Sequence, residues 1–430
     1  MRIRNDGTVS RLLREVPVPK MFHAAQQFPS AHIEREEIEQ VIFEEIARSG
    51  MGERIKPGMN IAITAGSRGI DNIALIIRET AAYLKELGAK PFIVPAMGSH
   101  GGAVAEGQVA ILKNFGITEE EMGCPIRATM DVDVFARLED GTPVHIDRYA
   151  HEADGIVVIN RIKPHTGFRG RYESGLYKMM TVGLGKQKGA ETTHGRGRLR
   201  MGETIEKSGN AFLEHTNILF GVATVENSFD RTYGLYAMTK DEIREMEPVH
   251  LETARALLPR LMIEYADVLV VDYMGKNISG TGMDTNITKS YTHGYGISRD
   301  GRAKRIAALD LTAETHGAAV GIGQADVTTQ RLFEKIDFNT TYPNLLTSGG
   351  TDSAKIPMVL DNQKLAIQAA IKTAAGADKE NIKMIRIRDT LHITEIEISE
   401  ALLEQAKAIP QIEIMSEPYE LEFDEDGNLF

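Results

Sequence analysis

Residues 60–115 repeat one pattern twice: a short apolar run, a loop containing glycine, and an amphipathic helix. The segments are, in order, 60–64, 65–69, 70–87, 92–94, 98–102 and 104–115. The first helix has apolar residues at three- and four-residue spacing and ends at Gly88, which is typical of a helix C-terminus. This alternation predicts a parallel sheet with binding loops at the carboxyl ends of its strands.

Further segments continue the α/β pattern along the chain. Short strands are expected at 126–130, 134–138, 143–146, 155–159 and 218–225, and a long helix at 240–265. A second series follows, with strands at 268–271, 306–311 and 382–387 and helices at 315–336, 362–375 and 399–406. The prediction is a fold of two α/β domains with largely parallel sheets and an active-site cleft between them.

The boundary between the two series is placed at residue 265. Residues 1–265 are expected to form the first domain, and residues 266–404 a second α/β domain that closes the cleft. The C-terminal tail, about 405–430, is not assigned to the second domain, and packing of this tail back on the first domain stays open. The boundary has no linker rich in proline or serine, which favours domains that pack closely.

Charge and cysteine content exclude several classes of protein. The chain has 61 Asp and Glu against 49 Lys and Arg, and this net charge of −12 is spread along it, so no nucleic-acid partner is expected. Cys124 is the single cysteine, which excludes disulfides and any metal centre that needs two protein thiolates. No stretch approaches the ~18 apolar residues of a membrane-spanning helix. A soluble, cytoplasmic protein is therefore expected.

Common catalytic signatures are absent. The chain has no GxxxxGK[ST] phosphate loop, no GxGxxG after a strand, no HExxH pair and no GxSxG elbow. The chemistry must therefore come from other side chains in the loops that follow the strands.

Two of these loops follow the first two strands of the repeated pattern. Arg68 lies in 64–69, where backbone N–H groups at the start of a helix favour an anion. A turn whose arginine faces solvent would give the same pattern. His100 lies in 98–102 among three glycines, which leave its ring uncovered and let another molecule approach closely.

Two later segments carry further groups. His165 again follows an apolar strand, where a turn with an incidental histidine is the alternative. Lys178 lies in a small, apolar run, so it is either functional or extends to solvent. His194 follows it. Histidines at separate loop ends can converge on one cleft, and two imidazoles across a substrate provide a base and an acid at neutral pH. A racemase or epimerase needs this arrangement.

These residues resemble the nickel-dependent lactate racemase family over most of residues 10–210. His100 in PAMGSHGG and His165 in KPHTGFRG match its two catalytic histidines. Lys178 in GLYKMMTVGLG matches the lysine that carries the cofactor, and His194 matches the histidine that binds nickel. Arg68 in AGSRG lies where the family has an arginine beside the substrate.

The resemblance implies a nickel-pincer nucleotide attached covalently at Lys178, with His194 as the metal ligand. Gly66 and Ser67, in the first loop, are assigned to cofactor binding. The implied reaction is reversible hydride transfer that inverts C2 of a 2-hydroxy acid, with His100 and His165 as proton partners. Cofactor-maturation proteins are the implied partners, and no oligomeric state follows.

Several positions depart from the family pattern around the substrate. Ala65 and Gly101 replace an acid and an arginine, and RGRYES lengthens the interval between His165 and Lys178. A sugar acid of the gluconate type is therefore expected rather than lactate. Hydrogen-bonding groups for it are expected from the loop 275–286, in particular from Lys276, Asn277 and Asp284.

Two other functions stay open from the sequence. One is a non-catalytic protein that binds the nickel nucleotide, and the other is a nicotinamide-dependent oxidoreductase, which the missing dinucleotide motif disfavours. His293 and His316 receive no role.

Overall fold

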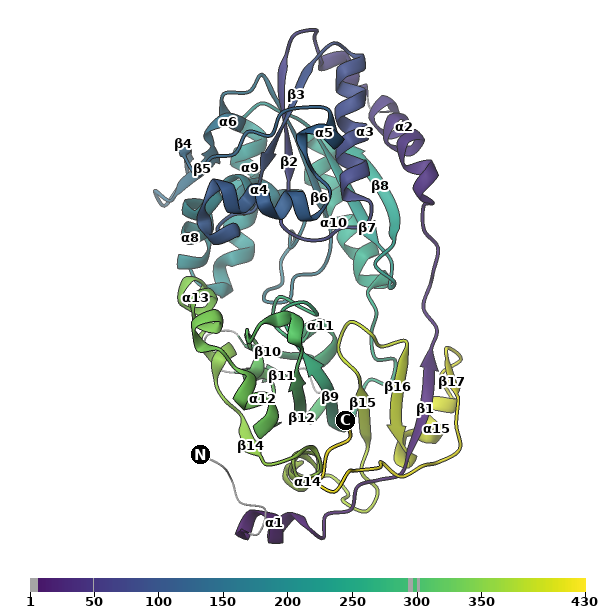
Figure 1. Cartoon of the computed structure of the whole chain (residues 1–430). Helices are drawn as coiled ribbons and strands as arrows, with labels where there is room; N and C mark the ends of the chain where they lie inside the picture. Colours follow the sequence, from purple (N-terminus) through teal and green to yellow (C-terminus); the bar gives the residue numbers. More distant parts are fainter. Residues whose placement is uncertain (1–6, 49, 293–296, 300–301) are drawn as a thin grey trace. The chain divides into compact units, whose positions relative to one another are not determined.

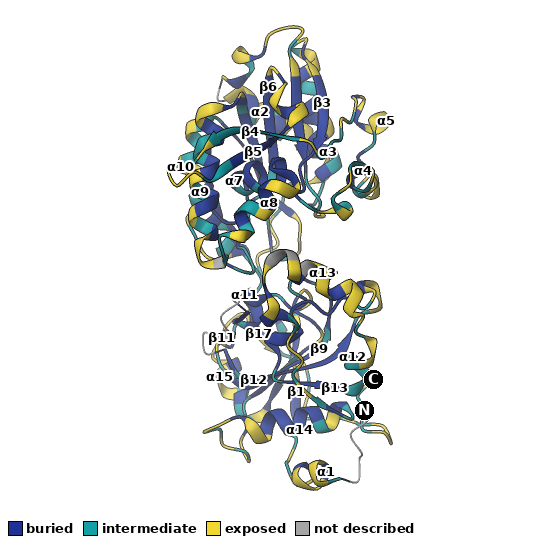
Figure 2. Ribbon diagram, turned by 90° about the vertical axis from the view of Figure 1, so that its left-hand side faces the viewer, coloured by how far each residue is buried: buried dark blue, intermediate teal, exposed yellow. Residues whose placement is uncertain are grey.

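The computed structural model describes residues 7–48, 50–292, 297–299 and 302–430. These residues form two compact units (Figure 1). We call residues 29–258 the central unit, and residues 1–28 with 259–430 the terminal unit. Each unit has its own sheet and its own buried residues, which lie mainly on the strands and on the inner sides of the helices (Figure 2).

The central unit is built on a five-stranded sheet of order β3-β2-β6-β7-β8. The first four of these strands are parallel, and the edge strand β8 is antiparallel to β7. The strands are β2 (Asn60–Ala65), β3 (Lys90–Pro95), β6 (Gly155–Arg161), β7 (Ile218–Glu226) and β8 (Thr232–Met238), with a separate hairpin of β4 (Val132–Arg137) and β5 (Pro143–Asp147).

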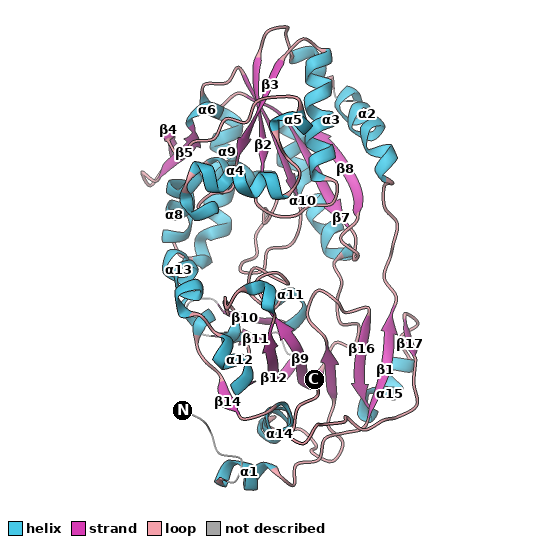
Figure 3. Ribbon diagram, in the orientation of Figure 1, coloured by secondary structure: helices cyan, strands magenta, loops and turns pink. Residues whose placement is uncertain are grey.

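Helices cover both faces of this sheet (Figure 3). Successive residues of a strand face opposite sides, so Ile156 and Val158 of β6 lie in one core, while Val157 and Ile159 lie in the other. The helices of the unit are α2 (Ile38–Arg48), α3 (Ile73–Glu86), α4 (Ala105–Asn114), α5 (Glu119–Met122), α6 (Arg148–His151), α7 (Leu176–Lys178), α8 (Lys186–Gly195), α9 (Met201–His215) and α10 (Lys240–Leu257).

The terminal unit has an eight-stranded sheet of order β14-β13-β12-β9-β15-β16-β1-β17. The strands from β14 to β15 are parallel, whereas β16, β1 and β17 pair antiparallel. The bounds are β1 (Met21–Gln26), β9 (Ala266–Met274), β12 (Ala303–Leu311), β13 (Val327–Thr329), β14 (Met358–Leu360), β15 (Met384–Ile387), β16 (Glu395–Ser399) and β17 (Ile412–Ile414), beside a hairpin of β10 (Ser290–Thr292) and β11 (Ile297–Arg299).

The helices of the terminal unit are short. They are α1 (Thr8–Leu13), α11 (Thr285–Thr288), α12 (Gln330–Lys335), α13 (Phe338–Ser348), α14 (Gln363–Thr373) and α15 (Leu403–Lys407). Across the described ranges of both units, no helix is long and apolar enough to span a bilayer. The predicted α/β class with largely parallel sheets is confirmed.

The chain divides differently from the expected boundary at 265. Residues 1–28 belong to the terminal unit because β1 lies between β16 and β17 in its sheet. The residues after 404 also belong to that unit, where β17 pairs with β1 and Tyr419 bridges Met21. The central unit is thus an insertion between β1 and β9.

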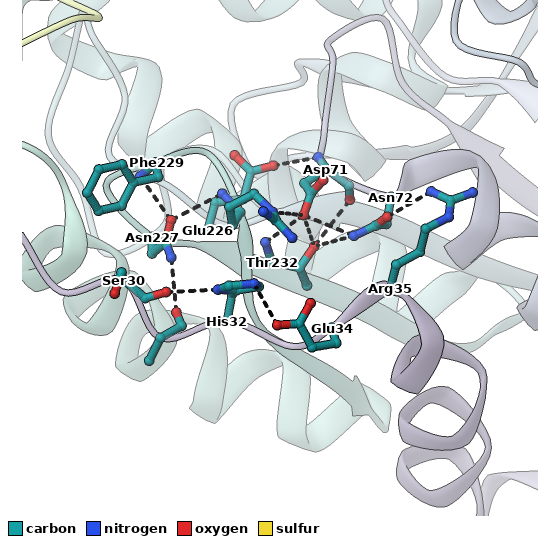
Figure 4. Close-up of polar contacts among 12 residues, drawn as sticks. Ser30, His32, Glu34, Arg35, Asp71, Asn72, Glu226, Asn227, Phe229 and Thr232 are labelled. Atoms are coloured by element: carbon teal, nitrogen blue, oxygen red, sulfur yellow. Dashed lines mark hydrogen bonds and ion pairs between the residues drawn. The ribbon is translucent and has the colours of Figure 1, made fainter.

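One turn of the central unit holds both ends of this insertion. Asn227, which follows β7 and is labelled in Figure 4, donates from Nδ2 to the carbonyl of Ala31 at 3.0 Å. The next residue, Ser228, donates from its hydroxyl to the carbonyl of Leu257 at 2.6 Å. The segments that enter and leave the central unit therefore lie close together.

Three expected elements are wrong. The region 315–336 is not one helix, because Gly317 and Gly321 adopt positive φ values of 79° and 96° and the β-branched Val327–Thr329 form β13. The helix α10 ends at Leu257 rather than at 265, since Pro259 disfavours a helical residue before it. The expected strand at 126–130 is reduced to one bridge between Ile93 and Ile126.

Candidate active site

Three loops of the central unit lie at one edge of its sheet. They follow the carboxyl ends of the parallel neighbours β3, β2 and β6, and they contain His100, Arg68 and His165 respectively. This edge is where open α/β sheets bind ligands.

Glycines bring two of these loops against the helical segment that follows Lys178. This segment, Met179–Leu184, is a π-helix, a form that is frequent at functional sites. A Cβ atom on Gly66 would lie 3.0 Å from Met179 Cε, and one on Gly183 would lie 2.7 Å from the carbonyl oxygen of Ala96. Gly98 also donates its N–H to the carbonyl of Gly183 at 3.3 Å. The absence of side chains is what allows these backbones to approach.

His100 is exposed and contacts the first loop. Its Nδ1 is hydrogen-bonded to Ser67 Oγ. When the proton lies on Nδ1 and is donated to the hydroxyl, Nε2 carries a lone pair and is a base. The two loops are therefore joined through the imidazole itself.

His165 is half-buried and its neutral tautomer is determined. The backbone N–H of Gly167 donates to His165 Nδ1 at 2.9 Å, so the neutral ring carries its proton on Nε2. The ring packs on Phe168, with 4.3 Å between centroids. His165 thus presents an N–H donor, the complement of the base that His100 can present.

The buried carboxylate of Glu173 organises the His165 loop. It accepts the backbone N–H of His165 at 2.7 Å and that of Gly170 at 3.2 Å. It also pairs with Arg255 of α10 at 2.5 Å. The loop is in this way fixed to a helix of the core.

Lys178 ends the one-turn helix α7 and is half-buried. Its pKa is lowered to about 7, first by loss of solvation and then by the positive charges of Arg68 and Lys163, while Glu173 opposes the shift. At pH 7 the Lys178 side chain is therefore an uncharged, nucleophilic amine in about half of the molecules.

The start of α7 is held by a second buried carboxyl group. Glu247 of α10 accepts the backbone N–H groups of Leu176 at 3.1 Å and Tyr177 at 3.2 Å. Burial raises the pKa of Glu247 to about 8 against these two hydrogen bonds. This contact fixes the turn from which Lys178 projects.

His194 lies near the end of α8, which directly follows the π-helix. The residue is half-buried. Arg196, just beyond α8, forms an ion pair of 2.5 Å with Asp140 in the β4–β5 hairpin. In the part of the chain that the structure describes, no cluster of three or more His, Cys, Asp or Glu could hold a metal ion.

Arg68 is exposed, and the loop around it is anchored at its far end. The pKa of Arg68 is lowered by loss of solvation and by Arg161, which forms an ion pair with Glu226. Asp71 donates its N–H to Glu226 at 2.8 Å and accepts from the hydroxyl of Thr232 at 2.9 Å (Figure 4). These contacts attach the loop that carries Arg68 to β7 and β8.

The expected substrate residues of the loop 275–286 lie in the terminal unit, after β9. Lys276 donates its N–H to Thr315 Oγ1 at 2.9 Å. Asn277 Oδ1 accepts from the Thr312 hydroxyl at 2.7 Å, and Asp284 caps α11. His316 is exposed with a φ of 50°, and His293 lies outside the described residues.

Sequence reasoning missed the buried polar groups that support these loops. Glu247 had a signal, because it shares one helix face with the buried Ile243 and Leu251, four residues away on either side. Gln108 and Lys186 are also fully buried, and nothing in their spacing distinguished them.

Residues 11–204 match the family model described as the lactate racemase N-terminal domain. This chain therefore carries a lactate racemase N-terminal domain. The domain match begins in the terminal unit and continues through α8 and the residue His194. It thus contains the loops of Arg68, His100 and His165 together with Lys178.

Two further comparisons accompany this domain assignment. The curated proteins gave no match. Among solved structures, the chain is similar to the lactate racemase apoprotein from Thermoanaerobacterium thermosaccharolyticum, with 14% sequence identity, a TM-score of 0.46 and 81% of each chain covered.

Proposed function

We propose that this protein is an isomerase that inverts C2 of a 2-hydroxy acid with a nickel-pincer nucleotide bound covalently at Lys178. The observation that carries the proposal is the lowered pKa of Lys178, about 7, within a lactate racemase N-terminal domain. A free amine at neutral pH is what the formation of an amide-type bond to the cofactor requires.

The residues around Lys178 fit such a group. The glycines at 66 and 98 let the backbone of their loops lie close to the π-helix, and Ser67 adds a hydroxyl. His194, after the π-helix, is proposed as the nickel ligand. When bound, the cofactor supplies a reversible acceptor for the hydride of C2.

The proton chemistry belongs to the two histidines. In one direction, Nε2 of His100 would accept the proton of the substrate hydroxyl while C2 is oxidised and a 2-keto acid forms. His165 would act on the other side of the reaction. Once protonated to the imidazolium by solvent, it would return a proton from Nε2 to the substrate oxygen when hydride comes back to the opposite face, while His100 loses its extra proton to solvent. The net reaction transfers no electrons and inverts C2.

Substrate binding is assigned to charged and polar groups. Arg68 is proposed to pair with the carboxylate of the substrate. Lys276, Asn277 and Asp284 are proposed to bind the hydroxyl groups of a sugar acid of the gluconate type, in preference to lactate.

The test is expression together with the cofactor-maturation proteins, followed by intact mass and metal analysis. The proposal expects about one nickel per chain, a mass adduct that maps to Lys178, and inversion at C2. A panel of C2-deuterated lactate, malate, 2-hydroxyglutarate and gluconate-type acids identifies the substrate. An unmodified mass after co-expression would overturn the proposal, and an adduct without inversion of any acid would support a non-catalytic nucleotide-binding protein instead.

A further inference from the structure

We propose that Gln108 and Lys186 are positioning residues for His100. The inference rests on the proposed role of His100 and adds two buried side chains that are not among the groups proposed to bind substrate or cofactor. Gln108 lies on α4 and Lys186 begins α8, and both are fully buried.

Gln108 clamps both ends of the turn that presents His100. Its Nε2 donates to the carbonyl of Gly98 at 2.9 Å and to the carbonyl of His100 at 3.2 Å. The turn also lies directly on α4, since a Cβ atom on Gly107 would be 2.0 Å from the carbonyl oxygen of Gly101. The backbone of His100 is therefore held in place by the side-chain amide of Gln108 and by the close contact between Gly101 and Gly107 of α4.

Lys186 sets the orientation of that amide. Its Nζ donates to Gln108 Oε1 at 3.0 Å. A flipped amide would place its NH₂ group against the ammonium of Lys186 and its oxygen against the two carbonyl oxygens. Only the observed orientation therefore gives the ammonium an acceptor and both carbonyls a donor. The cation of Lys186 thus determines that Gln108 donates to the His100 turn.

The ammonium is itself fixed by further buried acceptors. Lys186 Nζ lies 3.1 Å from Asp147 Oδ2 of β5, and both side chains have 0% exposure. It also donates to the carbonyl of Pro95, where β3 ends. Burying a charged pair is unfavourable unless its geometry is well satisfied, so a buried lysine in the interior of this unit needs a reason.

The backbone conformation of Lys186 also favours a role for this residue in positioning the His100 turn. Its φ is 53°, a left-handed conformation that is uncommon for a residue with a side chain. Strain of this kind persists where the surrounding structure requires it and is frequent at functional sites. Here it begins α8, the helix on which His194 lies, so one residue links the His100 turn to that helix.

The test uses Gln108→Glu, which keeps the length of the side chain and the acceptor for Lys186 but removes the donor to Gly98 and His100. The readout is the rate of carbethoxylation of His100 by diethyl pyrocarbonate in the full chain, measured by peptide mass spectrometry. His316, exposed in the terminal unit, is the internal reference, and Lys188→Met, an exposed lysine of the same helix, is the matched control.

We expect the rate at His100 to change by about threefold or more in Gln108→Glu, and the rate at His316 to stay constant. In the cofactor-loaded enzyme, kcat should fall by on the order of tenfold to a hundredfold with little change in KM or nickel content. If Gln108→Glu does not fold, Lys186→Met combined with Asp147→Asn removes the cation without leaving an unpaired carboxylate and should give the same pattern.

Parent-like labelling of His100 in both variants would overturn the proposal. Equal changes at His100 and His316, or the same change in Lys188→Met, would also overturn it, because they indicate a general loss of structure. The labelling needs no substrate or cofactor, so it decides this inference even if the proposed isomerase activity fails its own test.

Discussion

Lys178 is uncharged in a larger fraction of molecules at neutral pH than a lysine with the ordinary pKa. Its pKa of about 7 predicts that a limiting amount of an amine-reactive reagent at pH 7 modifies Lys178 before the exposed Lys188. The rate against pH should have a midpoint near 7, measured by peptide mapping. Lys163→Met should move this midpoint upward, because the variant removes a positive charge that disfavours the ammonium. A midpoint near 10 in the parent protein would contradict the prediction.

The raised pKa of Glu247 predicts that the free energy of unfolding depends on pH. Its pKa is 4.5 in the unfolded chain and about 8 in the folded one, so between these values the folded state holds a proton that the unfolded state has lost. The free energy of unfolding from this group falls by about 1.4 kcal/mol per pH unit as pH rises through that window. Glu247→Gln cannot ionise and keeps an oxygen for the N–H groups of Leu176 and Tyr177.

Urea unfolding at pH 5, 6.5 and 8 measures this effect. The variant should gain stability relative to the parent as pH rises, with the largest difference at pH 8. A difference that is constant across the three pH values would show that Glu247 is already ionised in the folded protein.

At the scale of elements, the contact between the π-helix and the His100 loop depends on Gly183. Gly183→Ala would place a Cβ atom 2.7 Å from Met179 Sδ and from the carbonyl oxygen of Ala96. We expect a loss of about 1–3 kcal/mol in the free energy of unfolding and weaker attachment of cofactor at Lys178. Gly195→Ala, in α8 with no atom within 4 Å of the added Cβ, is the matched control. Equal melting temperatures for the two variants would contradict the prediction.

The sequence predicts elements well where one period dominates. The run at 60–64 and the helical spacing after it correspond to β2 and α3, and the loops between strands and helices fall at one sheet edge. The prediction fails at 315–336. Apolar residues there have helical spacing, but the segment contains two glycines with positive φ and a short strand. Local spacing does not record which backbone conformation the neighbouring loops require.

The same limit applies to the candidate site. His100, in a loop after a strand, and Lys178, at the end of a one-turn helix, are visible from the sequence because each is a polar residue that interrupts a glycine-rich or apolar run. The supporting groups Glu173 and Gln108 are not, since each acts on backbone atoms brought near it only by the fold. The lowered pKa of Lys178 also depends on Arg68, more than a hundred residues earlier in the chain.

At the scale of the whole molecule, the central unit has its own sheet and two buried cores. A fragment of residues 29–258 should therefore fold alone and unfold cooperatively on heating, measured by circular dichroism. A chain that lacks residues 1–28 should instead lose the terminal unit, because β1 pairs on both sides and its removal separates β16 from β17. A disordered fragment 29–258 would contradict this division.

The turn at Asn227 and Ser228 has a consequence for the order in which the chain folds. Before the central unit forms, β1 and β9 are joined by a long flexible loop whose closure is entropically unfavourable. Once that unit has folded, its two ends are held at neighbouring residues of one turn, and the insertion acts as a short connection. The sheet of the terminal unit then assembles at the entropic cost of a short loop, so the connectivity favours formation of the central unit first.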